Sequence, residues 1–145
     1  MKFYTFCTQG YNGLRHAVRL AAAVRLGAQS LEVSGLLTRT LALAPERSSL
    51  ESGAEVRWRA QVLAPLELEV ALGARWRGFD VVDPDLGVIR EELQLDGQLR
   101  ADFELSDHLA IFIGLDARRV IANTASLTYS RLGASAGVRF SLGAW

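Results

Sequence analysis

The sequence predicts an all-β protein with eight antiparallel strands in up-and-down order. The first observation is a strict two-residue alternation of apolar and polar side chains, which is the period of a β-strand and not of a helix. The second is that all three prolines (Pro45, Pro65 and Pro84) fall between the alternating segments, where a missing N–H disrupts no strand pairing. The third is that short and long connections alternate along the chain, as in a series of hairpins. The 145 residues are expected to form a single domain, residues 1–145.

Four strands are expected in the first half of the chain. A short first strand lies near residues 2–9. Residues 14–26 set apolar side chains, mostly leucine, valine and alanine, at even positions against arginines at odd ones. Residues 31–43 alternate less cleanly, because two leucines are adjacent and Arg39 falls on the apolar face, where its long side chain can reach polar surroundings. Residues 54–62 return to clean alternation.

Four more strands are expected in the second half. Residues 66–77 alternate leucine, valine and alanine with glutamate and arginine. Residues 93–105, LQLDGQLRADFEL, keep the two-residue period without a break, so one face of this strand is apolar and the other charged. Residues 109–118 and 132–142 complete the set. Short connections are expected at residues 27–30, 64–65 and 106–108, and longer polar ones at 44–53, 80–92 and 121–129. All tight turns therefore lie at one end of the sheet, together with both chain termini.

Composition narrows the function classes. Sixteen basic and sixteen acidic residues cancel, so no basic surface for nucleic acid is predicted. Cys7 is the only cysteine, which excludes an intramolecular disulfide and a Cys/His metal site. The two histidines, His16 and His108, are expected near opposite ends of the strands, too far apart to share an active site. We assign no catalytic, cofactor-binding or metal-binding residue and expect the protein not to be an enzyme.

The polar faces of the strands carry charges of both signs. Near-balance of charge suits an ion-paired interior, because an uncompensated buried charge is costly. The hairpin registers place Asp96 opposite Arg118, and Arg59 opposite Glu69. The residues expected to form this network are Arg57, Arg59, Glu67, Glu69, Asp96, Arg100, Asp102, Arg118 and Arg139.

Aromatic side chains are expected near the two ends of the strands, as in the aromatic belts of membrane proteins. Trp76, Phe79, Tyr11 and Tyr129 fall near the long connections, and Phe103, Phe140 and Trp145 near the tight turns. Trp58 falls in the middle of its expected strand and does not fit this distribution.

The C-terminal segment SAGVRFSLGAW resembles the final strand of bacterial outer-membrane β-barrel proteins. It contains Gly137, the alternating hydrophobic residues Phe140 and Leu142, and the terminal aromatic residue Trp145. The resemblance implies that barrel-assembly machinery recognises this strand. In architecture the chain resembles the small OmpA/OmpX-type barrels of the Gram-negative cell envelope, whose apolar faces contact outer-membrane lipid and lipopolysaccharide.

We therefore expect an eight-stranded antiparallel up-and-down transmembrane β-barrel with a closed, ion-paired lumen, located in a bacterial outer membrane. Its expected role is structural, anchoring or partner-binding through the long loops. In one of these loops, Asp80, Asp83 and Asp85 are candidate contacts for a protein partner, or for a divalent cation that bridges to lipopolysaccharide.

Two alternatives stay open. The chain can be the C-terminal portion of a larger pore-forming or transport barrel, or a soluble lipocalin-like ligand-binding barrel with its apolar face inward. The start of the chain lacks the pattern of a secretory signal. We accordingly expect either a signal that has been removed or a longer parent chain.

Overall fold

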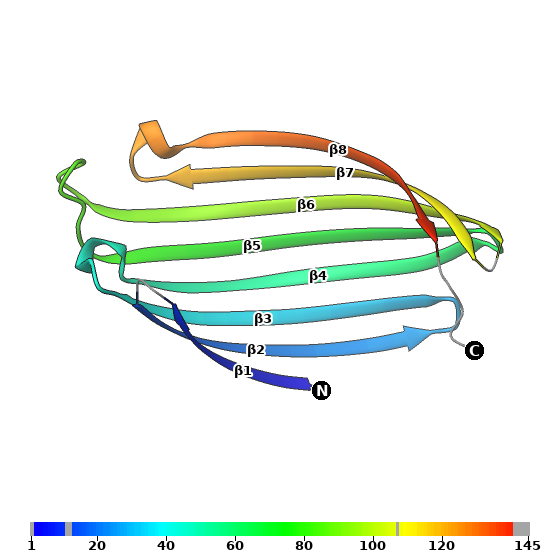
Figure 1. Ribbon diagram of the computed structural model, residues 1–145, viewed down its shortest axis with the longest axis horizontal. Helices are drawn as coiled ribbons and strands as arrows, with labels where there is room; N and C mark the ends of the chain where they lie inside the picture. The colour runs from blue at the N-terminus through cyan, green and yellow to red at the C-terminus, as the bar shows by residue number, and fades with distance from the viewer. Residues whose placement is uncertain (1, 11–12, 107, 141–145) are drawn as a thin grey trace.

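The computed structural model describes the backbone of residues 2–10, 13–106 and 108–140, and the side chains of residues 13–106 and 108–140. Eight antiparallel strands form one sheet in which every strand pairs with its neighbours in sequence (Figure 1). The strands are β1 (Lys2–Gly10), β2 (Gly13–Leu26), β3 (Gln29–Ala42), β4 (Ser49–Leu63), β5 (Leu66–Val82), β6 (Ile89–Ser106), β7 (Leu109–Ala122) and β8 (Tyr129–Phe140). The predicted antiparallel meander is confirmed.

The two ends of the sheet are connected differently. At one end, β2–β3, β4–β5 and β6–β7 are each joined by two residues. At the other end, β3–β4, β5–β6 and β7–β8 are each joined by six, and two of these connections contain the short 3-10 helices η1 (Pro45–Arg47) and η2 (Ala125–Leu127). We call these the turn end and the loop end. The predicted asymmetry between short and long connections is confirmed.

The η1 and η2 connections repeat one local structure. In the first, the backbone N–H of Ala42 donates to the Ser48 hydroxyl at 3.0 Å, and in the second that of Ala122 donates to the Thr128 hydroxyl at 3.1 Å. Each hydroxyl residue follows the 3-10 turn and satisfies the last donor of the preceding strand. These two connections are therefore compact turns, not open loops.

The strands extend farther toward the loop end than predicted. β4 begins at Ser49 instead of residue 54, and β6 begins at Ile89 instead of residue 93. β5 continues to Val82, which pairs with Ile89. In these extensions polar and apolar residues no longer alternate, so the alternation of hydrophobicity ends before the backbone pairing does.

The two faces of the sheet differ in chemistry and in exposure. The face with the charged side chains is the more crowded one: Thr38 is 1% exposed and Glu51 is 5% exposed. The opposite face consists of leucine, valine and isoleucine and is open, with Leu72 62% exposed and Leu132 79% exposed. Figure 1 shows that the sheet is curved. Because side chains crowd on the concave face of a curved sheet, the lower exposure indicates that the charged face is the concave one. We call the two faces inward and outward.

Very little apolar surface is buried. Among the described side chains, the buried hydrophobic residues are Ala60, Ala71, Ala110 and Val120. A water-soluble domain of this size buries most of its large apolar side chains. The sheet by itself therefore has no conventional hydrophobic core.

The strand pairing stops at β1 and β8. In the described part of the chain, β2 is the only partner of β1, and β7 is the only partner of β8. The structure thus establishes a curved eight-stranded sheet, and closure into a barrel is a further step that the pairing does not include.

Candidate functional site

The inward face carries the predicted charge network. Both predicted registers are confirmed, since Asp96 pairs with Arg118 and Arg59 pairs with Glu69. Each register pair is also an ion pair, with Arg118 Nε 2.6 Å from Asp96 Oδ1 and Arg59 Nε in contact with the Glu69 carboxylate. The regular alternation of these strands therefore positions charged side chains, and not only backbone, opposite one another.

Asp96 is the most highly connected carboxylate on this face. Besides Arg118, it accepts a hydrogen bond from Arg75 Nη2 at 3.1 Å and one from Gln94 Nε2 at 2.7 Å. Arg75 also lies 3.8 Å from Glu51. Asp96 thereby links β5, β6 and β7 through side chains alone.

A second cluster lies toward the turn end around Asp102. Its carboxylate receives two hydrogen bonds from Arg100, at 2.7 and 2.9 Å, and lies 3.4 Å from Arg139 Nη1 on β8. On β4, Arg57 lies 3.8 Å from Glu69, which also binds Arg59. Eight of the nine residues predicted for the network take part in ion pairs. The ninth is Glu67, which forms no ion pair with the described residues.

Gly137 has a packing role within this cluster. It lies opposite Phe112, and a Cβ at position 137 would be 2.6 Å from the Phe112 ring. The Arg100 guanidinium lies 4.2 Å from the centre of the same ring. Glycine therefore lets the ring lie across β8 beneath a cation. Of the other predicted assembly-signal residues, Phe140 is outward and exposed, and Leu142 and Trp145 lie outside the described residues.

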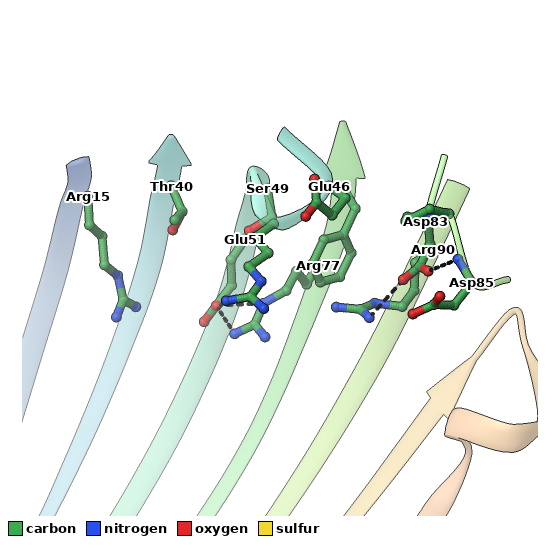
Figure 2. Close-up of a pocket in the computed structure, with 12 residues that line it drawn as sticks. Arg15, Thr40, Glu46, Ser49, Glu51, Arg77, Asp83, Asp85 and Arg90 are labelled. Atoms are coloured by element: carbon green, nitrogen blue, oxygen red, sulfur yellow. Dashed lines mark hydrogen bonds and ion pairs between the residues drawn. The ribbon is translucent and has the colours of Figure 1, made fainter. Parts of the chain in front are cut away.

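A hollow of about 540 Å³ opens on the inward face at the loop end (Figure 2). On one side, Arg77 donates to Glu51 at 2.5 and 3.2 Å. On the other, Arg90 lies 3.7 Å over the Phe79 ring and 3.1 Å from Glu92. The hollow is lined by Arg15, Thr40, Glu46, Arg47, Ser49, Glu51, Arg77, Phe79, Asp83, Pro84, Asp85 and Arg90. Four of its eight charged residues are paired within the lining, as Glu51 with Arg77 and Asp83 with Arg90.

Sequence reasoning missed Glu51, Arg90 and Glu92 because it placed them in connections. A signal for Glu51 was present, since it continues the odd-numbered series of Glu55 and Arg57 on the same face. No comparable signal existed for Arg90, which is next to two consecutive glutamates.

The outward face has polar side chains near both of its ends. At the loop end, Arg39 forms two hydrogen bonds to Asp80, at 2.7 and 2.5 Å. At the turn end, the Trp58 indole N–H donates to the side chain of Gln29 at 3.3 Å. Trp58 lies within β4, five residues before its last residue, and pairs with Val70, which in turn pairs with Leu99. The prediction that Trp58 lies mid-strand, away from the aromatic residues near the strand ends, is confirmed.

The three aspartates predicted as loop contacts, Asp80 near the end of β5 and Asp83 and Asp85 in the β5–β6 connection, do not form a common site. Asp80 is outward and bound to Arg39, whereas Asp83 lies 3.4 Å from Arg90 and accepts the backbone N–H of Asp85. In the described part of the chain, no group of three His, Cys, Asp or Glu side chains is arranged to hold a metal ion. These residues shape the connection and do not chelate a cation together.

The histidines lie at opposite ends of the sheet. His16 is near the loop end of β2, and His108 directly precedes β7 at the turn end.

No protein-family model, curated protein or solved structure matches this chain. Among the described residues, no helix is long and apolar enough to cross a membrane. The geometry above is thus the basis for any functional conclusion.

Proposed function

We propose that this protein is an integral β-barrel of a bacterial outer membrane, with a closed, ion-paired lumen and a structural, anchoring or partner-binding role. The observation that carries the proposal is the opposition of the two faces. The outward face exposes leucine, valine and isoleucine side chains, and the inward face carries a half-buried charge network. A membrane barrel requires this arrangement, and a soluble barrel requires the reverse.

The height of the apolar surface fits a bilayer. On β5 the outward residues from Leu66 to Trp76 are apolar, and the next polar outward residue is Asp80. These eleven residues span about 33 Å along the strand at ~3.3 Å per residue. A strand tilt of ~40° reduces this to about 25 Å, the height of the apolar band of outer-membrane barrels.

Charge distribution supports closure of the sheet on itself. The edge regions are cationic: β2 carries three arginines on the inward face and β8 carries two, with no acidic residue on either strand. In the middle, β6 carries four inward acidic residues and two inward arginines. In a closed barrel of eight strands, β2 lies across the lumen from β6, and β8 across from β4, which carries Glu51 and Glu55. Closure therefore places Arg15 and Arg25, which form no ion pair with the described residues, across from the net acidic β6, and Arg131 across from Glu51 and Glu55 of β4.

Lipid gives a second reason for closure. An open sheet edge in hydrocarbon leaves backbone N–H and C=O groups unsatisfied, at several kcal/mol each. The interior of an eight-stranded barrel is just wide enough for side chains to fill. We accordingly propose that the arginines and carboxylates occlude the lumen and that the barrel does not conduct solutes.

The runner-up is a larger pore-forming barrel of which these eight strands are a part. The observation that favours it is the open edge at β1 and at β8 in the described residues. In that case the same charges line a water-filled channel. A soluble lipocalin-like barrel is the weakest alternative, because it requires the exposed leucine face to be the core.

Refolding from urea separates these three functions. The proposal predicts β-sheet circular dichroism only in detergent micelles, a folded band whose gel mobility changes on boiling, one chain per micelle, and no conductance steps in planar bilayers. A larger barrel predicts conductance, or folding only in assemblies of several chains. A monodisperse β-protein without detergent would overturn the membrane assignment.

A further inference from the structure

The outward face contains a hollow at one place where its side chains are small. Gly97 on β6 pairs with Ala117 on β7, and the two are flanked in the same row by Leu72 on β5 and Leu132 on β8. The hollow above them has a volume of about 530 Å³. This volume lies within the range of ~300–1,000 Å³ typical of small-molecule sites.

A cation borders this hollow on its loop side. The next row toward the loop end contains Arg119 between Leu95 and Ser130, and all three residues line the hollow. Arg119 is exposed and forms no ion pair with the described residues. Inward residues Asp96, Arg118 and Arg131 also border the hollow, and the first two are bound to each other.

Arg39, the other arginine on the outward face in the described part of the chain, differs from Arg119 in having an acidic partner. Arg39, on β3, is neutralised by the carboxylate of Asp80. Arg119 has no such partner in the described protein, yet it occupies an equivalent place near the loop end, three residues before the end of β7. A charge on the lipid-facing side of a barrel is tolerated near the interface, where anionic headgroups are available.

We infer that this hollow binds a membrane lipid with an anionic phosphate headgroup. Its acyl chain lies over Gly97 and Ala117 between the two leucines, and Arg119 with the Ser130 hydroxyl binds the phosphate. The inference rests on the proposed function, because it requires the outward face to contact lipid. The unpaired cation selects an anionic lipid, and the apolar walls select an acylated ligand over free phosphate.

A larger side chain at position 97 would fill the proposed lipid site. A Cβ built there meets only Leu72 Cδ2, at 3.7 Å, which is an ordinary contact. Valine also has a higher strand propensity than glycine, so Gly97→Val fills the hollow without a steric barrier to folding. The matched control is Gly35→Val on β3, where the nearest atom to a Cβ is 3.9 Å away and which does not line this hollow. Arg119→Gln removes the cation, and its charge-matched control is Arg25→Gln on the inward face of β2.

The experiment is native mass spectrometry of the refolded protein in micelles doped with dioleoylphosphatidylglycerol, dioleoylphosphatidylcholine or inorganic phosphate. We expect retention of phosphatidylglycerol over phosphatidylcholine and no retention of phosphate. Arg119→Gln should lower phosphatidylglycerol retention about fivefold, the effect of one arginine near an anionic lipid surface. Gly97→Val should lower it at least as much, and both controls should match the wild type.

Each opposite result has a distinct meaning. Equal retention of the two lipids, or unchanged retention by Gly97→Val, would overturn the lipid site while leaving the membrane barrel intact. Retention of inorganic phosphate alone would show a simple anion site and would overturn the acyl part of the inference. A protein that shows no heat-modifiable folding in micelles would overturn the proposed function, and the lipid site with it.

Discussion

The substitution Asp96→Asn tests how strongly the inward face is shielded from water. Asparagine has nearly the same shape as aspartate but lacks the charge, so the change removes one carboxylate from contact with Arg75, Arg118 and Gln94. Arg75 retains Glu51 at 3.8 Å, whereas Arg118 has no other ion-pair partner among the described residues.

The magnitude follows from exposure. Loss of one partner from a fully buried pair costs ~3–5 kcal/mol, and loss of one from an exposed pair costs ~0.2–1 kcal/mol. The side chain of Asp96 is 24% exposed, and those of Arg75 and Arg118 are 41% and 43% exposed, which places the pair between these limits. For a closed lumen we expect the free energy of unfolding to fall by about 2 kcal/mol.

The assay is urea unfolding in lipid vesicles, followed by tryptophan fluorescence. The matched control is Glu67→Gln, an inward carboxylate that forms no ion pair with the described residues, which should change stability by less than ~0.5 kcal/mol. In a double-mutant cycle, Asp96→Asn and Arg118→Gln should show a coupling energy of about 1 kcal/mol. If Asp96→Asn is as mild as the control, the inward face is hydrated and the closed lumen is refuted in favour of a wide, water-filled one.

Three further substitutions test the two faces. Leu99→Arg places a charge at the middle of the outward face and should lower the free energy of unfolding in vesicles by about 2–4 kcal/mol. Gly137→Val drives a side chain into the Phe112 ring and should lower it by about 1–3 kcal/mol, because overpacking displaces the ring. Asp80→Asn leaves Arg39 without its carboxylate but near the interface, so urea unfolding should show a loss below about 1 kcal/mol.

Each of these has a control or an opposite outcome. Leu93→Arg, at the loop-end edge of the apolar surface, should lower the free energy of unfolding by only ~0–1 kcal/mol. An equal loss for Leu93→Arg and Leu99→Arg would contradict a depth-dependent contact with lipid. Gly35→Val serves as the control for Gly137→Val, since its Cβ has room. A loss above 2 kcal/mol for Asp80→Asn would place Arg39 within hydrocarbon and not at its edge.

The register of the central strands was predictable from the sequence because two constraints agree. The apolar alternation fixes which residues share a face, and a tight turn fixes which residue lies opposite which. Together they placed Asp96 opposite Arg118 and Arg59 opposite Glu69, two residue pairs from different hairpins.

The loop end was harder to predict for a physical reason. Between Asp80 and Glu92 the apolar residues come as the adjacent pairs Val81–Val82 and Val88–Ile89, so backbone pairing continues without a two-residue period in hydrophobicity. The Arg39–Asp80 pair was missed for this reason, because Asp80 was placed in a connection. Barrel closure could not be predicted from the sequence pattern either. Alternation shows which residues of one strand share a face, but it carries no information on whether the first strand pairs with the last.

The order of the strands has a consequence for how the protein folds. All seven observed pairings join strands that are adjacent in sequence, and three of the hairpins close over only two residues. Such local contacts form early, because little chain entropy is lost in closing a short loop. In the proposed barrel, the seam between β1 and β8 is the one contact that joins the two ends of the chain. That seam should close last and set the slow kinetic phase, so substitutions on β8 should change the folding rate more than substitutions of equal cost on β5.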